Sequence, residues 1–257
     1  MTRTAVITGA SGGIGRAVAA RLAADGYRIA GLDLVDPAMP EVAHYPADVT
    51  DAGQVAAAVE RAAADHGRLD ALVTCAGITE GSPLHETSEA DWHRVMDTNL
   101  TSVFLSVRAV LPHLLRAGAG AVVTVGSVLH RTAAPGLPAY AAAKGAIAAL
   151  GRQLTVDYGH RGISFVTVSP GWVRTPATES RLAPGERLER LRESNPMRHL
   201  VTAEEIAAAV AFALSPAAAA LSGSELVLDA GASTVSPASL LRDGHRRRMG
   251  LPPLDAD

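Results

Sequence analysis

The residues best suited to chemistry are a tyrosine and a lysine four positions apart, Tyr140 and Lys144. Lys144 is the single lysine of the chain, and the other 22 of its 23 Lys and Arg residues are arginines. Residues i and i+4 share a helix face, so the phenol and the ammonium group can lie side by side. A cation beside a phenol favours the phenolate and lowers its pKa from about 10, which suits acid–base catalysis near neutral pH. The alternative is an ordinary surface pair on an alanine-rich helix.

A second candidate site is the glycine-rich segment at residues 8–15, which reads Thr-Gly-Ala-Ser-Gly-Gly-Ile-Gly between a predicted strand and a predicted helix. Glycines permit a tight turn and a close approach of ligand to backbone. The free amides at the start of the helix favour an anion such as a phosphate. A glycine cluster alone is weak evidence, but this strand-to-helix context is the one that dinucleotide binding requires.

Two carboxylates follow the next predicted strands. Asp33 ends the second strand, 18 residues after Gly15, where a carboxylate can accept hydrogen bonds from a ribose diol and would repel a 2′-phosphate. Asp33 could instead be a simple turn residue. Asp48 and Val49 follow the third strand, where an adenine could lie, although Asp48 could equally begin a turn or cap the next helix.

Strand and helix patterns alternate along the whole chain, which predicts βαβ units and a parallel sheet covered by helices on both faces. The expected strands are Thr4–Thr8, Tyr27–Leu32, Ala43–Ala47, Ala71–Thr74, Ala121–Val125, Ile163–Val168 and Glu225–Leu228. The expected helices are Gly13–Ala24, Ala52–His66, Glu89–Met96, Leu100–Leu115, Ala139–Tyr158 and Ile206–Leu214.

Length and composition narrow the class of protein. A chain of 257 residues forms one large α/β domain or two small ones. The net charge of −3 predicts no general attraction to nucleic acid or membrane. Cys75 is the only cysteine, so no internal disulfide is possible. With no signal region and no apolar run of membrane-spanning length, the expectation is a soluble cytoplasmic protein.

Two segments have no clear pattern. Residues 175–197 contain three prolines and many charges, and an irregular stretch of that length is usually functional or disordered. The polar tail, residues 235–257, carries three consecutive arginines at 246–248. We expect that arginine run to be solvated, the alternative being that the tail packs on a neighbouring subunit.

Over residues 3–232 these motifs resemble the classical short-chain dehydrogenase/reductase family. Its glycine pattern is matched by Thr8, Gly9, Gly13 and Gly15, its Tyr-x-x-x-Lys pair by Tyr140 and Lys144, its catalytic serine by Ser127, its catalytic asparagine by Asn99, and its nicotinamide-holding segment by Pro170, Gly171 and Thr175. The resemblance implies a Rossmann-type, doubly wound parallel sheet of about seven strands in a single domain spanning residues 1–257.

The resemblance also implies roles for the matched residues. Tyr140 is expected to be the general acid and base, Lys144 to lower its pKa and hold the nicotinamide ribose, Ser127 to bind the substrate oxygen, and Asn99 to keep a water beside Lys144. The expected contacts of the cofactor are Gly9, Ser11, Gly13, Ile14, Gly15, Asp33, Asp48, Val49, Ala76, Gly77, Tyr140, Lys144, Pro170, Gly171, Val173 and Thr175. Beside Ser127 and Tyr140, the substrate is expected to meet His130 and Trp172, although a structural role for His130 is equally open. No metal site is expected.

One position departs from the family pattern. The family usually has Asn-Ala-Gly after the fourth strand, and this chain has Cys75, Ala76 and Gly77. A thiol is a weak donor and a weak acceptor, whereas an asparagine amide is good at both. Some hydrogen bonding near the adenine ribose or between strands is therefore expected to be lost, with Cys75 serving as a small buried residue and not as a nucleophile.

The leading hypothesis is an NAD-dependent enzyme, with NADP disfavoured by Asp33, that transfers a hydride between nicotinamide and a secondary alcohol or ketone. The family spans dihydrodiol, sugar or polyol and hydroxyacyl-type substrates, and the sequence does not choose among them. The alternatives are a non-catalytic NAD(P)-binding redox-sensing regulator and a structural subunit. Both are disfavoured by the four matched residues Asn99, Ser127, Tyr140 and Lys144, called the tetrad below. The resemblance further implies a homotetramer or, failing that, a dimer.

Overall fold

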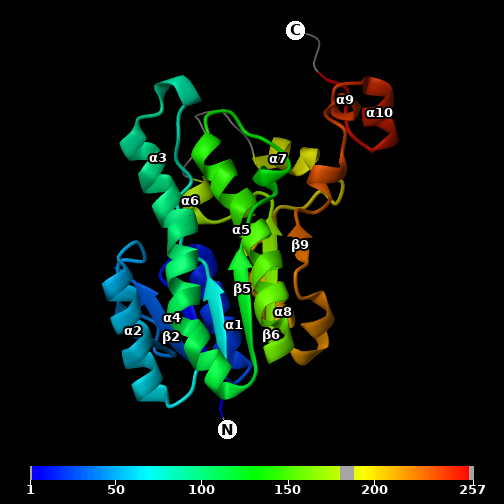
Figure 1. Ribbon diagram of the computed structural model, residues 1–257. Helices are drawn as coiled ribbons and strands as arrows, with labels where there is room; N and C mark the ends of the chain where they lie inside the picture. The colour runs from blue at the N-terminus through cyan, green and yellow to red at the C-terminus, as the bar shows by residue number, and fades with distance from the viewer. Residues whose placement is uncertain (1, 180–187, 255–257) are drawn as a thin grey trace.

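The computed structural model describes residues 2–179 and 188–254. Seven parallel strands form one sheet in the order β3-β2-β1-β4-β5-β6-β9. Figure 1 labels β2, β5, β6 and β9 of this sheet. Their bounds are β1 Thr4–Thr8, β2 Arg28–Asp33, β3 Val42–Pro46, β4 Ala71–Thr74, β5 Gly120–Val125, β6 Ile163–Pro170 and β9 Glu225–Leu228. This confirms the predicted seven-stranded parallel sheet, with strand limits that differ from the prediction by at most two residues.

Helices cover both faces of this sheet, as predicted. On one face α1 (Gly13–Ala24) and α8 (Ala203–Ala213) pack together over a core that includes Ile7, Leu22 and Ile206. On the other face lie α2 (Ala52–His66), α4 (Ser102–Ala117) and α5 (Pro138–Tyr158), over a core that includes Leu72 and Phe165. Every residue of β1 and β4 is buried, because a parallel sheet between two helical layers has no face in water.

The strand order reverses between β1 and β4, and this reversal indicates where a ligand would bind. β1 pairs with β2 on one side and with β4 on the other. In a doubly wound sheet, ligands bind outside the carboxyl ends of the strands at such a switch point. All seven strands are parallel, so the loops after β1, β4, β5 and β6 meet at one edge of the sheet.

The predicted helices at Glu89–Met96 and Leu100–Leu115 prove to be parts of one helical run. α3 (Glu89–Met96) continues through a π-helical turn, Asp97–Thr101, into α4. The run Glu89–Ala117 is apolar and long enough to cross a membrane by length and composition alone. Here its α4 part packs against α2, β4 and β5 as a core helix.

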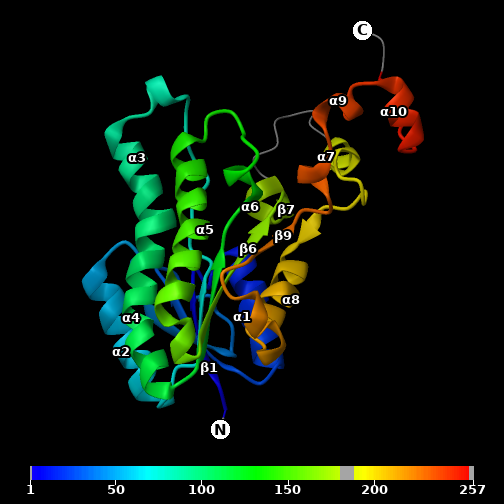
Figure 2. The ribbon, with the colours of Figure 1, turned by 45° about the vertical axis from the view of Figure 1, so that its right-hand side comes forward.

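Several short elements had no sequence signal. They are β7 (Val173–Arg174), which pairs with β8 (Val201–Thr202), and the helices α6 (Pro176–Glu179), α7 (Leu188–Ser194), α9 (Pro237–Leu240) and α10 (Asp243–Arg248). Residues 180–187, within the stretch that had no clear pattern, lie outside the described residues. Figure 2 shows α9 and α10 beyond the carboxyl end of the sheet, next to α7.

The expectation for the arginine run was wrong at one of its three positions. Arg247 and Arg248 are exposed, but Arg246 is only 6% exposed. It lies among backbone carbonyls of its own tail and beside Glu193 of α7. The tail therefore folds back on its own chain.

Candidate active site

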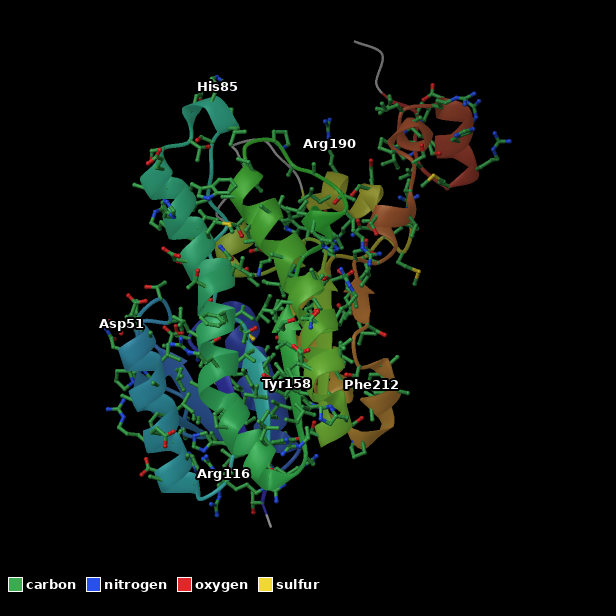
Figure 3. All side chains as sticks on the ribbon, viewed as in Figure 1. Asp51, His85, Arg116, Tyr158, Arg190 and Phe212 are labelled. Atoms are coloured by element: carbon green, nitrogen blue, oxygen red, sulfur yellow. The ribbon has the colours of Figure 1, made fainter. Side chains whose placement is uncertain are left out.

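The carboxyl edge of the sheet brings together the predicted tyrosine, lysine, serine and asparagine. Tyr140 and Lys144 lie in the first two turns of α5, Ser127 follows β5, and Asn99 lies in the π-helical turn before α4. Figure 3 shows His85 and Arg190 at this end of the molecule, with Arg116 at the opposite end. Residues separated by up to 45 positions in the sequence thus share one site.

Lys144 is a buried cation beside Tyr140. Its residue is 5% exposed, and its Nζ lies 5.6 Å from the centroid of the Tyr140 ring. Nζ donates a hydrogen bond of 2.9 Å to the backbone carbonyl of Val125 at the end of β5. The alternative of an ordinary surface pair is therefore wrong for Lys144.

Burial is the main influence on the charge of Lys144. It lowers the pKa of the Lys144 ammonium from its usual value, while the charges of Tyr140 and Cys75 act in the opposite direction. An isolated ammonium group is costly to bury, and Val125 supplies one backbone acceptor for its three N–H groups. Such an expensive placement is typical of a functional site.

Asn99 is held by two backbone carbonyls. Its Nδ2 donates to the carbonyls of Val95 and Ile78, each at 2.9 Å. The first of these bonds is within the helix, and the second reaches the loop after β4. The π-helical turn adds a residue to the helix at this point, which is a common way of presenting a functional side chain.

The other end of the Asn99 amide faces Gly77 and Lys144. Its Oδ1 is buried and has no hydrogen-bond partner among the described residues. A Cβ placed on Gly77 would lie 2.7 Å from this Oδ1 and 3.7 Å from Nζ of Lys144. Gly77 therefore leaves open the space that the amide oxygen and the ammonium group share, and an unsatisfied buried acceptor there calls for a polar partner.

Ser127 starts a short 3₁₀ turn, Val128–His130, at the end of β5. The residue is 6% exposed, and its Oγ accepts a hydrogen bond of 3.2 Å from the backbone N–H of Leu129. This bond uses the oxygen as an acceptor, so the hydroxyl hydrogen stays available for donation.

His130 points toward β9. Its Nδ1 contacts the backbone carbonyl of Ser127, and its Nε2 lies 3.3 Å from Oε1 of Glu225. Arg131 also pairs with the Glu225 carboxylate, whose side chain is 8% exposed. Both ring nitrogens thus face protein groups, which is the structural role that the sequence left open beside substrate binding. Glu225 was missed because a glutamate beginning an edge strand reads as a solvent-facing residue.

The glycine loop after β1 has the shape that its sequence predicted. Gly9 adopts a φ of +68°, and a Cβ there would lie 2.6 Å from the backbone nitrogen of Ala76. Gly12 is the N-cap of α1 and provides no side-chain cap. The backbone amides that begin α1, from Gly13 through Ile14 to Gly15, are the ones an anion would meet.

The loop at the start of α1 also meets the segment after β6. A Cβ on Gly13 would come 3.1 Å from Cγ2 of Thr175. Thr175 is held by Thr178, whose hydroxyl accepts from the Thr175 backbone N–H at 2.9 Å and donates to the Val173 carbonyl at 2.6 Å. Residues from the two ends of the predicted cofactor site are therefore in van der Waals reach.

Trp172, the other predicted substrate residue, lies between β6 and β7 and is 37% exposed. Pro170 ends β6, and the backbone N–H of Gly171 donates to the carbonyl of Leu228 in β9. These contacts fix the backbone on either side of the indole, which stays accessible to a ligand.

Asp33 keeps its carboxylate at the rim of the glycine loop. Its Oδ2 accepts from the backbone N–H of Ser11 at 2.9 Å, and its Oδ1 accepts from Val35 at 3.2 Å. Arg16 of α1 donates to the carbonyl of Pro37 in the loop after β2. Arg16 thus reaches the loop that follows Asp33, whereas Arg3 stacks over Tyr27, 4.2 Å from the ring centroid, at the amino end of the sheet.

Asp48 begins a turn, one of the alternatives left open by the sequence. Its Oδ1 accepts from both the backbone N–H and the hydroxyl of Thr50. The N-cap of α2 is Asp51, whose carboxylate accepts from Gly53 and Gln54. Val49 follows Asp48 and is half-buried, so the adenine role expected for the pair stays a prediction.

Cys75 lies beside the tetrad with an inactive thiol. Burial raises the pKa of the Cys75 thiol to about 12, although the charge of Lys144 lowers it slightly. A thiol this hard to ionise is a poor nucleophile. Residues 2–179 and 188–254 hold no cluster of three or more His, Cys, Asp or Glu side chains able to bind a metal ion.

Known proteins are similar in sequence to this chain over most of its length. A family model described as enoyl-(acyl carrier protein) reductase matches residues 9–233. The 2-(R)-hydroxypropyl-CoM dehydrogenase of Xanthobacter autotrophicus is 39% identical, with 89% of this chain and 98% of that protein covered. The cis-4-hydroxycyclohexanecarboxylate dehydrogenase of Sinomonas cyclohexanicum is 38% identical, with coverage of 91% and 97%.

Solved structures with the same fold include two oxidoreductases. The ligand-free aldohexose dehydrogenase of Thermoplasma acidophilum has a TM-score of 0.88 and 28% identity over 92% of this chain and 96% of that one. An actinorhodin polyketide ketoreductase with NADPH has a TM-score of 0.86 and 26% identity, over 91% and 98%. The chain belongs to the short-chain dehydrogenase/reductase family.

A nicotinamide dinucleotide fits the residues of this short-chain dehydrogenase/reductase. A Cβ on Gly9, Gly13 or Gly77 would meet Ala76, Thr175 or Asn99, so the glycines let these segments lie close together with no side chain over the loop amides. The buried Oδ1 of Asn99 lacks a partner among the described residues. The amides of the glycine loop suit a pyrophosphate, and the carboxylate of Asp33 suits a ribose diol. The donor set and the open backbone cradle thus agree on the kind of ligand.

Proposed function

We propose that this protein transfers a hydride between NAD and the carbinol or carbonyl carbon of a small secondary alcohol or ketone. Membership of the short-chain dehydrogenase/reductase family makes it an oxidoreductase of alcohol- or ketone-type substrates. The observation that carries the finer proposal is the buried Lys144 beside Tyr140, facing the unpartnered oxygen of Asn99 across Gly77.

A bound nicotinamide supplies the carbon that accepts or gives the hydride. The residues proposed to hold the cofactor are the amides of Gly13, Ile14 and Gly15 for the pyrophosphate, Asp33 for the adenosine ribose and Lys144 for the nicotinamide ribose. Pro170, Gly171, Val173 and Thr175 form the proposed support for the carboxamide. This chain's own side chains then manage the proton.

Tyr140 is the proposed acid and base. In the oxidation direction its oxygen takes the proton of the substrate hydroxyl as the carbinol carbon loses its hydride, and in reduction the same oxygen returns that proton. Lys144 stabilises the phenolate electrostatically, because a positive charge beside a phenol favours its ionised form. Acid–base assistance of this kind is typically worth about 10²–10⁴-fold in rate.

Ser127 and Asn99 are the proposed positioning groups. The Ser127 hydroxyl has its hydrogen free and donates it to the substrate oxygen, which fixes that oxygen next to Tyr140. The Asn99 Oδ1, which has no partner among the described residues, is proposed to accept from a water beside Lys144 and so to link the lysine to a path for protons. Correct positioning of reacting groups contributes several kcal/mol to lowering a barrier, roughly 7–11 in well-oriented systems.

The substrate class rests on chemistry and on the names of two relatives. Both 2-(R)-hydroxypropyl-CoM and cis-4-hydroxycyclohexanecarboxylate carry a hydroxyl on a secondary carbon. Tyr140 and Ser127 provide one proton acceptor and one donor, which matches a single alcohol oxygen. Trp172, which follows β6, offers a partly exposed apolar surface and is the proposed contact for the rest of the substrate.

NAD is the proposed cofactor because Asp33 places a carboxylate where a 2′-phosphate would have to lie. Like charges at close range in a partly dry site are costly, on the order of a few kcal/mol. The similar ketoreductase with NADPH shows that the fold also accommodates the phosphorylated cofactor. The choice therefore depends on the local charges around Asp33.

We further propose one domain, a cytoplasmic location, and a homotetramer or dimer in solution. The support for assembly is apolar surface on the outer helices and the edge strand. Phe104 of α4, Val156 of α5 and Phe212 of α8 are 48%, 75% and 48% exposed, and Val227 of β9 is 38% exposed. Figure 3 shows Phe212 at the outer side of the molecule. Light scattering at micromolar concentration that gave a monomer mass would reject the assembly.

Two measurements on the purified protein test the function. Titration of NADH fluorescence measures cofactor binding, and a panel of secondary alcohols with NAD measures NADH formation. We expect tight binding and turnover of at least one alcohol. Binding without turnover of any alcohol or ketone, in either direction, would favour the redox-sensing regulator, and the absence of binding would reject both.

A further inference from the structure

The C-terminal segment after residue 235 is an addition to the family unit. The family model ends its match at residue 233, and the 2-(R)-hydroxypropyl-CoM dehydrogenase is covered over 98% of its length by 89% of this chain. The added residues form α9, α10 and a turn that ends at Leu251, which is 7% exposed. We call residues 237–251 the C-terminal hairpin.

Arg246 closes this hairpin and connects it to α7. Its Nε donates to the carbonyl of Pro252 at 2.7 Å, and its Nη1 donates to the carbonyl of Leu240 at 3.0 Å. Its Nη2 lies 3.4 Å from Oε2 of Glu193 on α7. A guanidinium is well suited to such a junction, because its rigid fork presents five N–H donors in fixed directions.

Arg198 makes a second connection between the same two parts. Its Nη1 donates to the backbone carbonyl of Glu193 at 2.6 Å, and its Nη2 donates to the carbonyl of Met249 at 2.5 Å. Its backbone has a φ of +52°, in the left-handed region that a non-glycine residue rarely occupies. A strained residue of this kind persists where its surroundings fix it, and here the hairpin provides part of that fixation.

The held segment runs on to the strand that pairs with β7, directly after the proposed substrate residue Trp172. After α7, the backbone N–H of Met197 donates to the carbonyl of Ala230, and Val201 pairs with Val173 in β7. β7 begins directly after Trp172. In Figures 1 and 2 α7 lies beyond the carboxyl ends of the strands, between the body of the sheet and the C-terminal hairpin.

We propose that the C-terminal hairpin determines substrate specificity by holding α7 over the substrate side of the active site, with Arg246 as its positioning residue. Arg246 acts through Glu193, next to the separate link that Arg198 makes to Met249, and none of its contacts is with the cofactor loop or the tetrad. The kinetic part of this inference rests on the proposed function, whereas the structural part does not. The two parts therefore have separate tests.

The structural test is hydrogen exchange of the amides in residues 188–199. Arg246→Met keeps the apolar stem and removes the donors, and Arg247→Met makes the same change at an exposed neighbour. We expect exchange of this segment to be at least about tenfold faster in Arg246→Met and unchanged in Arg247→Met, because exchange reports local opening. Equal exchange in Arg246→Met and wild type would overturn the proposal, whatever the activity of the protein.

The kinetic test uses the best alcohol from the panel. Arg246→Met should raise the KM for that alcohol by about tenfold and change its rank among the alcohols, because a charge-assisted contact is lost at the junction. The dissociation constant for NADH and the kcat should stay within about twofold, since neither depends on α7 in this arrangement. A parallel loss of NADH binding would mean a general structural defect and would contradict the proposed role.

Glu193→Gln provides the milder companion variant. The Glu193 side chain is 35% exposed, and glutamine has nearly the same size as glutamate. We therefore expect Glu193→Gln to fold even if Arg246→Met does not. We expect a smaller change in the same direction, about threefold in KM, with faster exchange in residues 188–199. If Glu193→Gln matched wild type in both measurements, the link from hairpin to α7 would be refuted.

Discussion

The ammonium group of Lys144 donates a 2.9 Å hydrogen bond to the backbone carbonyl of Val125. This bond joins the second turn of α5 to the end of β5, two residues before Ser127. The lysine beside Tyr140 is therefore also fixed to the strand that precedes Ser127. Its placement is nevertheless expensive, because burial lowers the pKa of Lys144 below its usual value of 10.5.

Replacing Lys144 by methionine should raise the stability of the ligand-free protein while abolishing turnover. Methionine fills a similar volume without a buried charge, and we expect a Tm higher by at least about 2 °C near pH 7. A charged lysine costs the fold free energy at pH values below its folded pKa, and that cost shrinks as the pH rises toward 10.5, where the unfolded lysine also loses its proton. The stability gain should therefore diminish as the pH rises toward 10.5.

Lys144→Arg is the matched control for charge. Arginine keeps the positive charge but carries a wide planar fork that does not fit beside Val125 and Gly77. We expect it to lose most of kcat without gaining stability. Scanning calorimetry at several pH values measures the effect, and a Lys144→Met protein less stable than wild type at pH 7 would show that the ammonium group stabilises this fold.

Tyr140→Phe should lose nearly all activity and keep cofactor binding. The change removes only the phenolic oxygen, and the ring still packs near Lys144. General acid–base catalysis contributes about 10²–10⁴-fold, so the residual rate should be below about 1% of wild type. NADH titration supplies the control for folding and binding. A rate above about a tenth of wild type would remove Tyr140 from its assigned role.

Glu225→Gln should slow turnover through Ser127. The Glu225 carboxylate lies against His130 and Arg131, and His130 contacts the backbone carbonyl of Ser127. Loss of that charge loosens the turn that begins at Ser127, and we expect kcat to fall by about three- to tenfold, the size of one lost charged contact. Glu204→Gln, at an exposed position on α8, should have no effect.

A double-mutant cycle separates this route from a general loss of stability. If Glu225 acts through Ser127, then Glu225→Gln should cost little in a protein that already carries Ser127→Ala. Additive losses in kcat would mean that the Glu225 contact serves the fold alone. The thermal transition of each variant, followed by circular dichroism, shows how much stability is lost.

Local patterns predicted most of the fold because they reflect local forces. The helix predicted at Ala52–His66 matches α2 to the residue, and the apolar run of Thr4–Thr8 matches β1. The π-helical turn around Asn99 was missed because it differs from an α-helix by only one inserted residue. That residue is stabilised by a tertiary contact, the hydrogen bond from Asn99 to the carbonyl of Ile78, which no local pattern shows. The pairing of His130 with Glu225 spans 95 positions, and no local pattern encodes it.

The C-terminal hairpin shows a second limit of sequence reasoning. Three consecutive arginines read as a solvated run, and Arg247 and Arg248 are indeed exposed. Arg246 is buried because backbone carbonyls of Leu240 and Pro252 happen to converge on it. Such convergence depends on tertiary geometry, so a sequence of three identical residues could not predict which of them is buried.

Asp33→Ser should shift the cofactor preference from NAD toward NADP. We expect the wild-type protein to favour NAD by at least about tenfold in kcat/KM, a difference of roughly 1.4 kcal/mol. The serine removes the carboxylate that now accepts from Ser11 and Val35, and with it the charge that would repel a 2′-phosphate. Asp36→Ser, at an exposed position in the same loop, should leave the ratio unchanged.

Arg16 is the candidate cation for the 2′-phosphate of NADP, because it reaches the loop that follows Asp33. Arg16 contacts the carbonyl of Pro37, four residues after Asp33, and a guanidinium binds phosphate in a bidentate manner. We therefore expect the Asp33→Ser protein to improve kcat/KM for NADP by about tenfold or more, and Arg16→Ala to reverse that gain. The measurement is kcat/KM with each cofactor for four proteins: wild type, Asp33→Ser, Asp36→Ser, and Asp33→Ser combined with Arg16→Ala. Equal or better use of NADP by the wild-type protein would mean that Asp33 does not face the ribose, and the assignment of NAD would then be withdrawn.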